Sequence, residues 1–343
     1  MRKNLLFPIF YGILMTSFTV YVVLDTFVIT RVYGAVEPTA SAYTASVDES
    51  ETTGSVTIDT GMTGTAAAES SSSVKRSKKK SSSSGTAERA SAETAETTVE
   101  AAVSTENTYQ DENISVTLTE YTVNDTAVYV ADVTLSSAGY LKTALAQGLY
   151  GKNVTESTSD MAEDNNAILA INGDYYGAQE KGYVLRNGVL YRSTAAKNQE
   201  DLVIYADGSF EIISESEITA QELLERGAMQ VFSFGPGLVE NGTVTVSENE
   251  EVDRAKASNP RTAIGILGEN HLVFVVSDGR TEASEGLSLY ELAEFMQSLG
   301  AETAYNLDGG GSSTMVFQGT VVNRPTSGDT IKERAVTDII CIL

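Results

Sequence analysis

The sequence is poor in the residue types on which many enzyme mechanisms depend. Its 343 residues include one Cys, one His and no Trp. Because Cys341 is the only cysteine, an intramolecular disulfide is excluded. Because His271 is the only histidine, zinc sites rich in His are excluded as well. A Ser-His-Asp triad would have to use His271, and no Gly-x-Ser-x-Gly elbow accompanies it.

Basic residues are also scarce. The chain has 23 Lys and Arg against 47 Asp and Glu, which gives a net charge of -24. This balance argues against nucleic acid as a partner, since phosphate contacts need clustered Lys and Arg. The EF-hand, Walker and GxGxxG patterns are absent too. The chemistry must therefore rest mainly on carboxylates, hydroxyls, amides and Arg.

The N-terminal segment is a long apolar run. Residues 5–24 carry no charge and are numerous enough to span a bilayer as a helix. Arg2 and Lys3 precede the run, so the positive-inside rule places the N-terminus in the cytoplasm. We interpret residues 1–35 as a cytoplasmic tip and transmembrane signal anchor, with a cleaved signal peptide as the alternative. The predicted location is the cell membrane, single-pass, with the rest of the chain extracellular.

Residues 36–107 are rich in Ser, Thr, Ala and Glu and contain few large apolar residues. Such a segment cannot bury enough surface to offset its ordering entropy, so we predict a disordered linker. A basic run at residues 74–80 interrupts its acidic composition. We interpret this run as solvated linker charge; attraction to anionic wall polymer or lipid head groups is the alternative.

Residues 108–343 have the patterns of a folded domain. Residues 114–123 and 126–135 alternate apolar and polar side chains, which is typical of half-buried strands. Asn-Gly at 187–188 and Asp-Gly at 207–208 predict hairpins. Capping boxes that begin at Thr219 and Ser288 predict two helices. The fold class is therefore α+β, a strand-rich mixed-sheet domain with a few helices.

Residues 304–316 read AYNLDGGGSSTMV and contain three consecutive glycines. Glycines suit a position where the backbone turns tightly or approaches a ligand closely, and successive N–H groups can bind an anion. A flexible hairpin loop is the alternative interpretation.

Further polar clusters follow the predicted strands, where a rigid scaffold can hold a site. Arg offers bidentate geometry to phosphate or carboxylate, and Asp174 and Asp308 could form the carboxylate pair of a glycosidase. The same two acids could bind a divalent cation such as Ca²⁺. The Asn-Gly at 172–173 and Asp-Gly at 278–279 are also common turn dipeptides, and Arg261 could be a surface cation.

Seven motifs in order resemble the phosphodiester glycosidase family: AINGDYY, NPRTAIG, VSDGR, a capped helix ending in LGA, AYNLDGGGSSTMV, NRP and ERAV. The resemblance covers residues 160–343 and implies an α+β catalytic domain that hydrolyses a sugar-1-phosphodiester. Bacterial members of the family are often linked to exopolysaccharide. The motifs carry over these site residues, the last three with weaker support: Asn172, Asp174, Arg261, Asp278, Arg280, Asn306, Asp308, Gly309, Gly310, Gly311, Ser312, Ser313, Asn323, Arg324 and Arg334.

The resulting hypothesis is a membrane-anchored extracellular hydrolase acting on a sugar-1-phosphodiester in a surface or exopolysaccharide-type glycan. Arg261, Arg280 and the amides of residues 309–311 would hold the phosphate. Asp308 or Asp174 would activate water or stabilise the oxocarbenium-like transition state, and Asn172 and Asn306 would bind sugar hydroxyls.

Two other functions stay open. One is a non-catalytic, Ca²⁺-assisted binder of anionic cell-surface glycan, and a weaker one is a scaffold that displays the domain. The pattern assigns no cofactor with certainty, and it leaves the oligomeric state, the natural glycan and the stereochemical outcome undecided.

Overall fold

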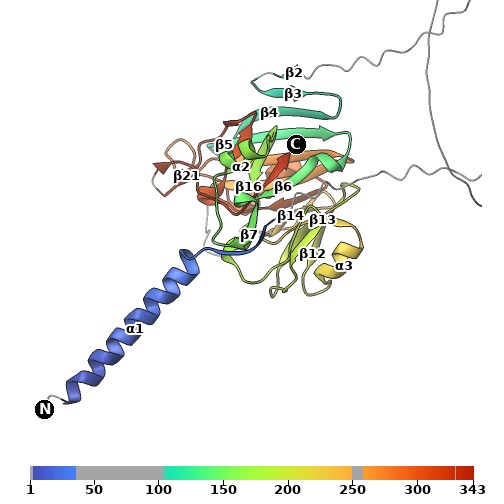
Figure 1. Cartoon of the computed structure of the whole chain (residues 1–343). Helices are drawn as coiled ribbons and strands as arrows, with labels where there is room; N and C mark the ends of the chain where they lie inside the picture. The colour runs from blue at the N-terminus through green and yellow to red at the C-terminus, as the bar shows by residue number, and fades with distance from the viewer. Residues whose placement is uncertain (1–2, 36–102, 105, 249–257, 329) are drawn as a thin grey trace, which may run out of the picture. The chain divides into compact units, whose positions relative to one another are not determined.

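A computed structural model describes residues 3–35, 103–104, 106–248, 258–328 and 330–343 (Figure 1). Three sheets make up most of the domain, and every strand pair in these ranges is antiparallel. The domain is strand-rich α+β as predicted, but its sheets are antiparallel rather than mixed. Tight hairpins join many sequential strands, and a hairpin reverses the chain direction.

The main sheet has nine strands in the order β15-β14-β18-β16-β17-β5-β4-β3-β2. Asn124 and Asp125 form the β4–β5 hairpin turn with positive φ angles of 46° and 57°, which matches the twist of the strands they join. Both strands lie where the alternation predicted them. The strands are β2 (Val103–Ser104), β3 (Thr108–Gln110), β4 (Ile114–Val123), β5 (Thr126–Leu135), β14 (Gly237–Glu240), β15 (Thr243–Val244), β16 (Arg261–Gly268), β17 (His271–Ser277) and β18 (Thr303–Asn306).

Two five-stranded sheets pack near the main sheet. The first has the order β20-β19-β8-β23-β6 and the second β10-β9-β13-β11-β12, and the second contains both predicted hairpins. Their strands are β6 (Leu141–Leu145), β8 (Leu169–Asn172), β9 (Val184–Arg186), β10 (Val189–Arg192), β11 (Glu200–Tyr205), β12 (Phe210–Ser214), β13 (Ala228–Phe232), β19 (Met315–Phe317), β20 (Thr320–Val321) and β23 (Asp338–Ile342). The short strands β21 (Thr326–Ser327) and β22 (Thr330–Ile331) form a separate two-stranded sheet.

Both predicted helices, α3 (Ala220–Glu225) and α4 (Leu289–Ser298), are confirmed with their capping boxes. A third, α2 (Thr158–Asp164), begins after the N-cap Ser157 and is too short to have shown helical periodicity. Short 3₁₀ turns are η1 (Ala138–Tyr140), η2 (Ala146–Gly148), η3 (Tyr176–Ala178) and η4 (Gly310–Ser312).

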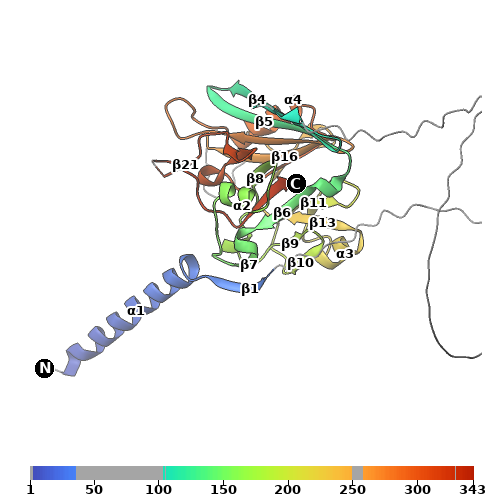
Figure 2. The same ribbon diagram turned by 45° about the horizontal axis from the view of Figure 1, so that its top comes forward.

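The central core joins all three sheets. Phe274 of the main sheet, Ile340 of β23 and Leu202 of β11 belong to one buried cluster. On the other face of the main sheet, α4 packs through Leu292 and Met296 (Figure 2). Burial on both faces stiffens the strands whose ends carry the polar motifs.

The N-terminal segment forms helix α1 (Lys3–Phe27) and strand β1 (Arg31–Ala35), and β1 pairs with β7 (Leu149–Lys152). In the part of the chain that the structure describes, none of the helices combines the length and apolar character needed to cross a membrane. The transmembrane anchor stays a prediction. Most of the predicted linker, including the basic run at 74–80, lies outside the described residues, and the sheet already begins at Val103, before the predicted boundary at 108.

Candidate active site

The ends of neighbouring strands gather the polar motifs. β8 ends at Asn172 and leads into Asp174, while its antiparallel partner β23 begins at Asp338. β18 ends at Asn306 and leads into Asp308. The Asp308 N–H donates to the Gly173 carbonyl at 3.2 Å, which brings the two predicted catalytic segments together.

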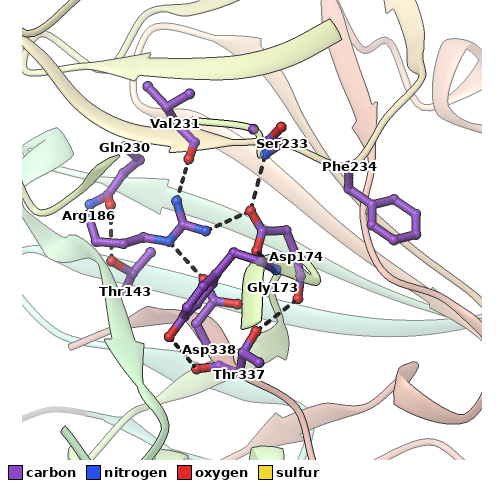
Figure 3. Close-up of polar contacts among 12 residues, drawn as sticks. Thr143, Gly173, Asp174, Arg186, Gln230, Val231, Ser233, Phe234, Thr337 and Asp338 are labelled. Carbon is purple, nitrogen blue, oxygen red and sulfur yellow. Dashed lines mark hydrogen bonds and ion pairs between the residues drawn. The ribbon is translucent and has the colours of Figure 1, made fainter. Parts of the chain in front are cut away.

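Asp174, Arg186 and Asp338 form a buried ion triad that was not predicted from the sequence (Figure 3). Arg186 Nη2 lies 2.7 Å from Asp174 Oδ2, and Arg186 Nε lies 2.7 Å from Asp338 Oδ2. Side-chain exposure is 1% for Arg186 and 0% for both acids. The remaining guanidinium nitrogen donates to the Leu185 and Val231 carbonyls. Each guanidinium nitrogen therefore has a partner, as a buried cation requires.

Backbone amides hold Asp174 further. The Ser233 N–H donates to Oδ2 at 3.1 Å, and the Tyr176 N–H donates to Oδ1 at 2.9 Å. Burial acts to lower the pKa of Arg186, but the attraction of Asp174 and Asp338 outweighs it and raises that pKa. Burial raises the pKa of Asp338 to about 7, against the opposing effect of Arg186. A single cation shared by two acids thus fixes one carboxylate, Asp174, in a single orientation.

Asp308 has a different setting. Its carboxylate accepts from Arg334 Nη2 at 2.9 Å and from Ser312 Oγ at 2.6 Å, and Arg334 Nε also donates to Ser312 Oγ. The Asp308 side chain is 11% exposed, whereas the Arg334 side chain is 44% exposed. Burial raises the pKa of Asp308, opposed by the Arg334 charge and the Ser312 hydroxyl. This ion pair therefore has one buried member and one that reaches solvent.

Both aspartates line one cavity of about 240 Å³, here called the catalytic cavity. Its lining is Asn153, Thr155, Asp174, Tyr175, Gly177, Ala178, Asp308, Ser312, Arg334, Ala335, Val336 and Thr337. Larger hollows of about 770 and 730 Å³ lie elsewhere, around Tyr129, and neither of the two aspartates lines them. Chemistry rather than volume selects the site, since the smaller cavity brings the two predicted catalytic aspartates and Arg334 together, and none of these three residues lines the larger hollows.

Asn172 and Gly173 support this cavity without lining it. Asn172 Nδ2 donates to the Asp308 carbonyl at 2.6 Å, and its Oδ1 accepts from Thr262 Oγ1 at 2.8 Å. Asn172 is fully buried, so it joins strand ends rather than binding sugar hydroxyls. A Cβ on Gly173 would lie 2.4 Å from Asp338 Oδ1. The glycine is therefore needed for close approach to the ion pair, not only as a turn residue.

The three glycines are packed against polar neighbours rather than free. The Gly310 N–H donates to the Pro260 carbonyl at 2.8 Å, and Ser312 and Ser313 N–H groups donate back to Gly309 and Gly310 carbonyls. Gly310 has φ +64°, and a Cβ there would lie 2.8 Å from Arg280 Nη2. The prediction that amides of this stretch cradle phosphate is thus wrong for the Gly310 amide, which already bonds to protein.

The other predicted arginines lie away from the described lining of the catalytic cavity. Arg261 is 3% exposed, and its Nε donates to the Leu287 carbonyl. Burial, followed by the nearby Arg280 charge, lowers the pKa of Arg261 to about 10. Arg280 is exposed and donates to Asn259 Oδ1. Of the four arginines predicted for the site, Arg334 is the one that lines the catalytic cavity together with Asp174 and Asp308.

The remaining predicted residues do not line the catalytic cavity; Asp278 and Arg324 line the hollow of about 730 Å³ instead. Asp278, whose pKa burial raises, accepts from the Arg324 N–H at 2.7 Å, while Asn323 bonds to the backbone of Met315 and Ser313. Asn306 is 1% exposed and donates to the Gly235 carbonyl. Asn306 is therefore also placed to hold loops together, and not to contact a sugar.

The acids do not suit the predicted Ca²⁺ site. Within residues 3–35, 103–104, 106–248, 258–328 and 330–343, no group of three or more His, Cys, Asp or Glu could hold a metal ion. Both aspartates already pair with Arg, and a cation would have to displace those pairs. A hard cation prefers several free oxygen ligands, so this donor set fits it poorly.

Sequence reasoning missed Arg186, Asp338 and Tyr175. Arg186 and Asp338 are charged residues within apolar strand segments, which is itself a signal, since a buried charge requires a partner. Tyr175 is 41% exposed and lines the catalytic cavity. The available signal in the sequence was an aromatic residue directly after the predicted acid Asp174.

Two carboxylates and a cation in one cavity define a glycosidase-type site. The sequence model of the phosphodiester glycosidase family (NAGPA) matches residues 165–343. This chain therefore belongs to the phosphodiester glycosidase family, and the family prediction is confirmed. Relatives of this chain include the N-acetylglucosamine-1-phosphodiester alpha-N-acetylglucosaminidases of mouse, cattle and human.

Among curated relatives, an SPbeta prophage-derived uncharacterized protein, YomE, of Bacillus subtilis is 30% identical over 198 residues. The match covers 56% of this chain and 30% of YomE. The mouse N-acetylglucosamine-1-phosphodiester alpha-N-acetylglucosaminidase is 28% identical over 207 residues, covering 54% of this chain and 39% of the mouse protein. The chain thus spans well under half the length of these relatives.

Solved structures show the same fold. The catalytic domain of the zebrafish N-acetylglucosamine-1-phosphodiester alpha-N-acetylglucosaminidase, auto-inhibited by its pro-peptide, matches with a TM-score of 0.52 and 22% identity. That match covers 67% of this chain and 82% of the zebrafish chain. A hypothetical protein from Synechocystis matches with a TM-score of 0.50 and 16% identity, over 68% of this chain and 62% of that one.

Proposed function

We propose that this protein hydrolyses the glycosidic bond of a sugar-1-phosphodiester. The observation that carries the proposal is the convergence of Asp174, Asp308 and Arg334 on one cavity. Family membership supports the same reaction class. The leaving group of this reaction is a phosphate ester that is already an anion, so it needs charge stabilisation more than protonation.

The three residues divide the work by their environments. Arg334 is half exposed and can offer its guanidinium to the phosphate while it stays close to Asp308. Asp174, held by Arg186 and two amides, provides a fixed negative charge for the oxocarbenium-like transition state. Asp308, whose pKa burial raises, is the candidate to activate water. The exposed Tyr175 ring provides a stacking surface for the sugar.

The sugar and the location are inferred from the relatives and from the N-terminal sequence. The relatives' names point to N-acetylglucosamine as the sugar, and the N-terminal charge pattern points to an extracellular location. A surface or exopolysaccharide-type glycan is the substrate class that fits both. Location and glycan stay predictions within this proposal.

Purified protein should release free sugar from UDP-N-acetylglucosamine or a related sugar-1-phosphodiester. Asp308→Asn should lower kcat by about 10²- to 10⁴-fold, because it removes the group placed to handle the proton. Circular dichroism and thermal unfolding should show an intact fold. Asp207→Asn, at an exposed hairpin turn, serves as the matched control and should keep full turnover. Unchanged turnover in Asp308→Asn would remove Asp308 from the mechanism.

No observation favours the Ca²⁺-assisted binder, because both of its proposed ligands are engaged with arginines. The same assay separates the two functions. Turnover that persists in excess chelator supports the hydrolase. Glycan binding without turnover, lost in chelator, would favour the binder.

A further inference from the structure

A second cavity adjoins the catalytic one. It has a volume of about 260 Å³ and is lined by Tyr33, Tyr150, Tyr176, Lys152 and Arg192, among others; we call it the tyrosine cavity. Gly177 lines both cavities, so they meet at this residue. Arg334 and Asp308 line the catalytic cavity but not the tyrosine cavity, so the tyrosine cavity does not include the proposed phosphate site.

The walls of the tyrosine cavity are a contiguous aromatic surface. The Tyr150 and Tyr176 rings stack at 5.4 Å with an interplanar angle of 23°, and the Tyr33 and Tyr150 ring centroids are 5.8 Å apart. Tyr33 is 61% exposed, so one face of the aromatic surface is open to a ligand. The Tyr176 N–H donates to Asp174 Oδ1, which ties this surface to the catalytic carboxylate.

Polar groups frame the aromatic rings. Lys152 Nζ, on a side chain that is 9% exposed, pairs with Glu180 Oε1 at 3.3 Å. Arg192 is fixed by hydrogen bonds to the carbonyls of Gly182, Tyr176 and Gln179. Its Nη2 is buried and has no acceptor among the described residues. An unpaired guanidinium N–H is unfavourable, and an adjacent sugar hydroxyl would satisfy it.

Strand β1 completes the cavity. Tyr33 comes from β1, which pairs with β7 and lies beside it in Figure 2. A Cβ on Gly151 of β7 would lie 2.2 Å from the Arg31 carbonyl oxygen, so only glycine allows β1 to approach this closely. Asn153, which lines the catalytic cavity, also donates to the Ile29 carbonyl at 3.0 Å. The N-terminal segment therefore reaches the borders of both cavities.

We propose that the tyrosine cavity is a subsite for a second sugar unit, attached on the glycone side of the bond that is cleaved, and that Tyr33 of β1 is part of it. This inference rests on the proposed function. Aromatic rings framed by a few hydrogen-bonding groups suit the apolar face and the hydroxyls of a pyranose. The shared border at Gly177 gives the two sugars a continuous path.

Kinetics on the full chain test the subsite with two probes: the p-nitrophenyl phosphodiesters of N-acetylglucosamine 1-phosphate and of chitobiose 1-phosphate. Wild-type protein should prefer the disaccharide in kcat/KM. Tyr33→Ala should lower kcat/KM for the disaccharide by about threefold to tenfold, the range of one aromatic contact, and leave the monosaccharide unchanged. Tyr121→Ala, an exposed tyrosine that packs edge-on against Phe295, is the control and should change neither.

A second variant tests the role of β1. Gly151→Ala should displace β1 and reproduce the Tyr33→Ala kinetics, whereas Gly268→Ala, where a Cβ would meet nothing within 4 Å, should not. Equal losses on both probes in Tyr33→Ala, or no preference for the disaccharide in wild-type protein, would overturn the subsite.

Calorimetry separates the subsite from the proposed reaction. In the Asp308→Asn background, the disaccharide probe should bind more weakly by the same threefold to tenfold when Tyr33 is also replaced by Ala. If no probe is hydrolysed by wild-type protein, the proposed function fails while this binding difference still supports the subsite. Identical affinities with and without Tyr33 would overturn it.

Discussion

The two aspartates of the catalytic cavity are held by arginines in opposite settings. Asp174 pairs with Arg186, which is 1% exposed and shared with Asp338. Asp308 pairs with Arg334, which is 44% exposed. The nitrogen–oxygen distances are similar, 2.7 Å for Arg186–Asp174 and 2.9 Å for Arg334–Asp308. The two ion pairs therefore differ in the burial of the arginine and in its number of acidic partners, not in length.

Because of this difference, the Arg186 ion pair is a rigid structural element, whereas Arg334 can move when substrate binds. Moving Arg186 would leave two buried carboxylates without a cation, so the Asp174 end of the cavity is rigid. Arg334 already contacts water and can turn toward an incoming phosphate at little cost. We therefore expect the Arg186 group to determine stability and the Arg334 group to determine substrate binding.

The largest effect should come from Arg186→Met. The change keeps much of the side-chain volume but leaves Asp174 and Asp338 buried and unpaired, so the free energy of unfolding should fall by about 3–5 kcal/mol. Urea unfolding at neutral pH measures it. Arg226→Met, at an exposed helix end, is the control and should change stability by no more than about 0.5 kcal/mol. A loss as small as the control's would mean that the buried ion pair is not needed for the fold.

Arg334→Met should lower the free energy of unfolding less than Arg186→Met does, because it unpairs one buried carboxylate rather than two, and its main effect should be on substrate. The loss of a charge-assisted contact to phosphate should raise KM by about 10- to 100-fold. Because the Arg334 charge opposes the effect of burial on Asp308, its removal should raise the pKa of Asp308 further. The acidic limb of the pH–rate profile should then shift to higher pH. A variant with normal KM and an unshifted profile would contradict the assignment of Arg334 to the phosphate.

Asp338→Asn should have the smallest effect at acidic pH, where the wild-type carboxyl is protonated, and the effect should grow as the pH rises. Burial raises the pKa of Asp338 from 3.8 to about 7, so the folded protein binds this proton more tightly than the unfolded chain. Its stabilising contribution is present below about pH 4 and is lost as the pH rises through about 7. In wild-type protein the resulting slope is on the order of 1 kcal/mol per pH unit.

Asn at position 338 can still accept from Arg186 Nε but cannot titrate, so urea unfolding from pH 4 to 8 should show a flatter profile. Some slope should remain, since burial followed by the Glu215 charge raises the pKa of Asp201 as well. An unchanged slope in Asp338→Asn would show that Asp338 does not hold a proton in this range.

Much of the fold could be predicted because its signals are local. The hairpins at Asn187 and Asp207 and the helices after Thr219 and Ser288 depend on turn and cap chemistry within a few residues. Whether neighbouring strands run parallel or antiparallel was harder to predict, since strand pairing joins segments that are far apart in the sequence.

The site divides in the same way. The motifs located Asp174, Asp308 and Arg334 along the chain, and the structure brings all three to one cavity. The structure does not favour the assignment of Asn172 and Asn306 to sugar hydroxyls, because both side chains are buried and each donates to a backbone carbonyl. A polar residue at a strand end has the same sequence pattern whether it faces a ligand or a neighbouring loop.

The sequence by itself determined the family, the scarcity of His and Cys chemistry, and the order of the polar motifs, because these depend on residue identity alone. Only the tertiary structure decided which arginine serves which acid. Arg186 and Asp338 are 152 residues apart, and the strands that carry them come together only when the core packs. The role of Tyr33 was equally inaccessible, since it depends on β1 reaching the edge of β7 beside Gly151.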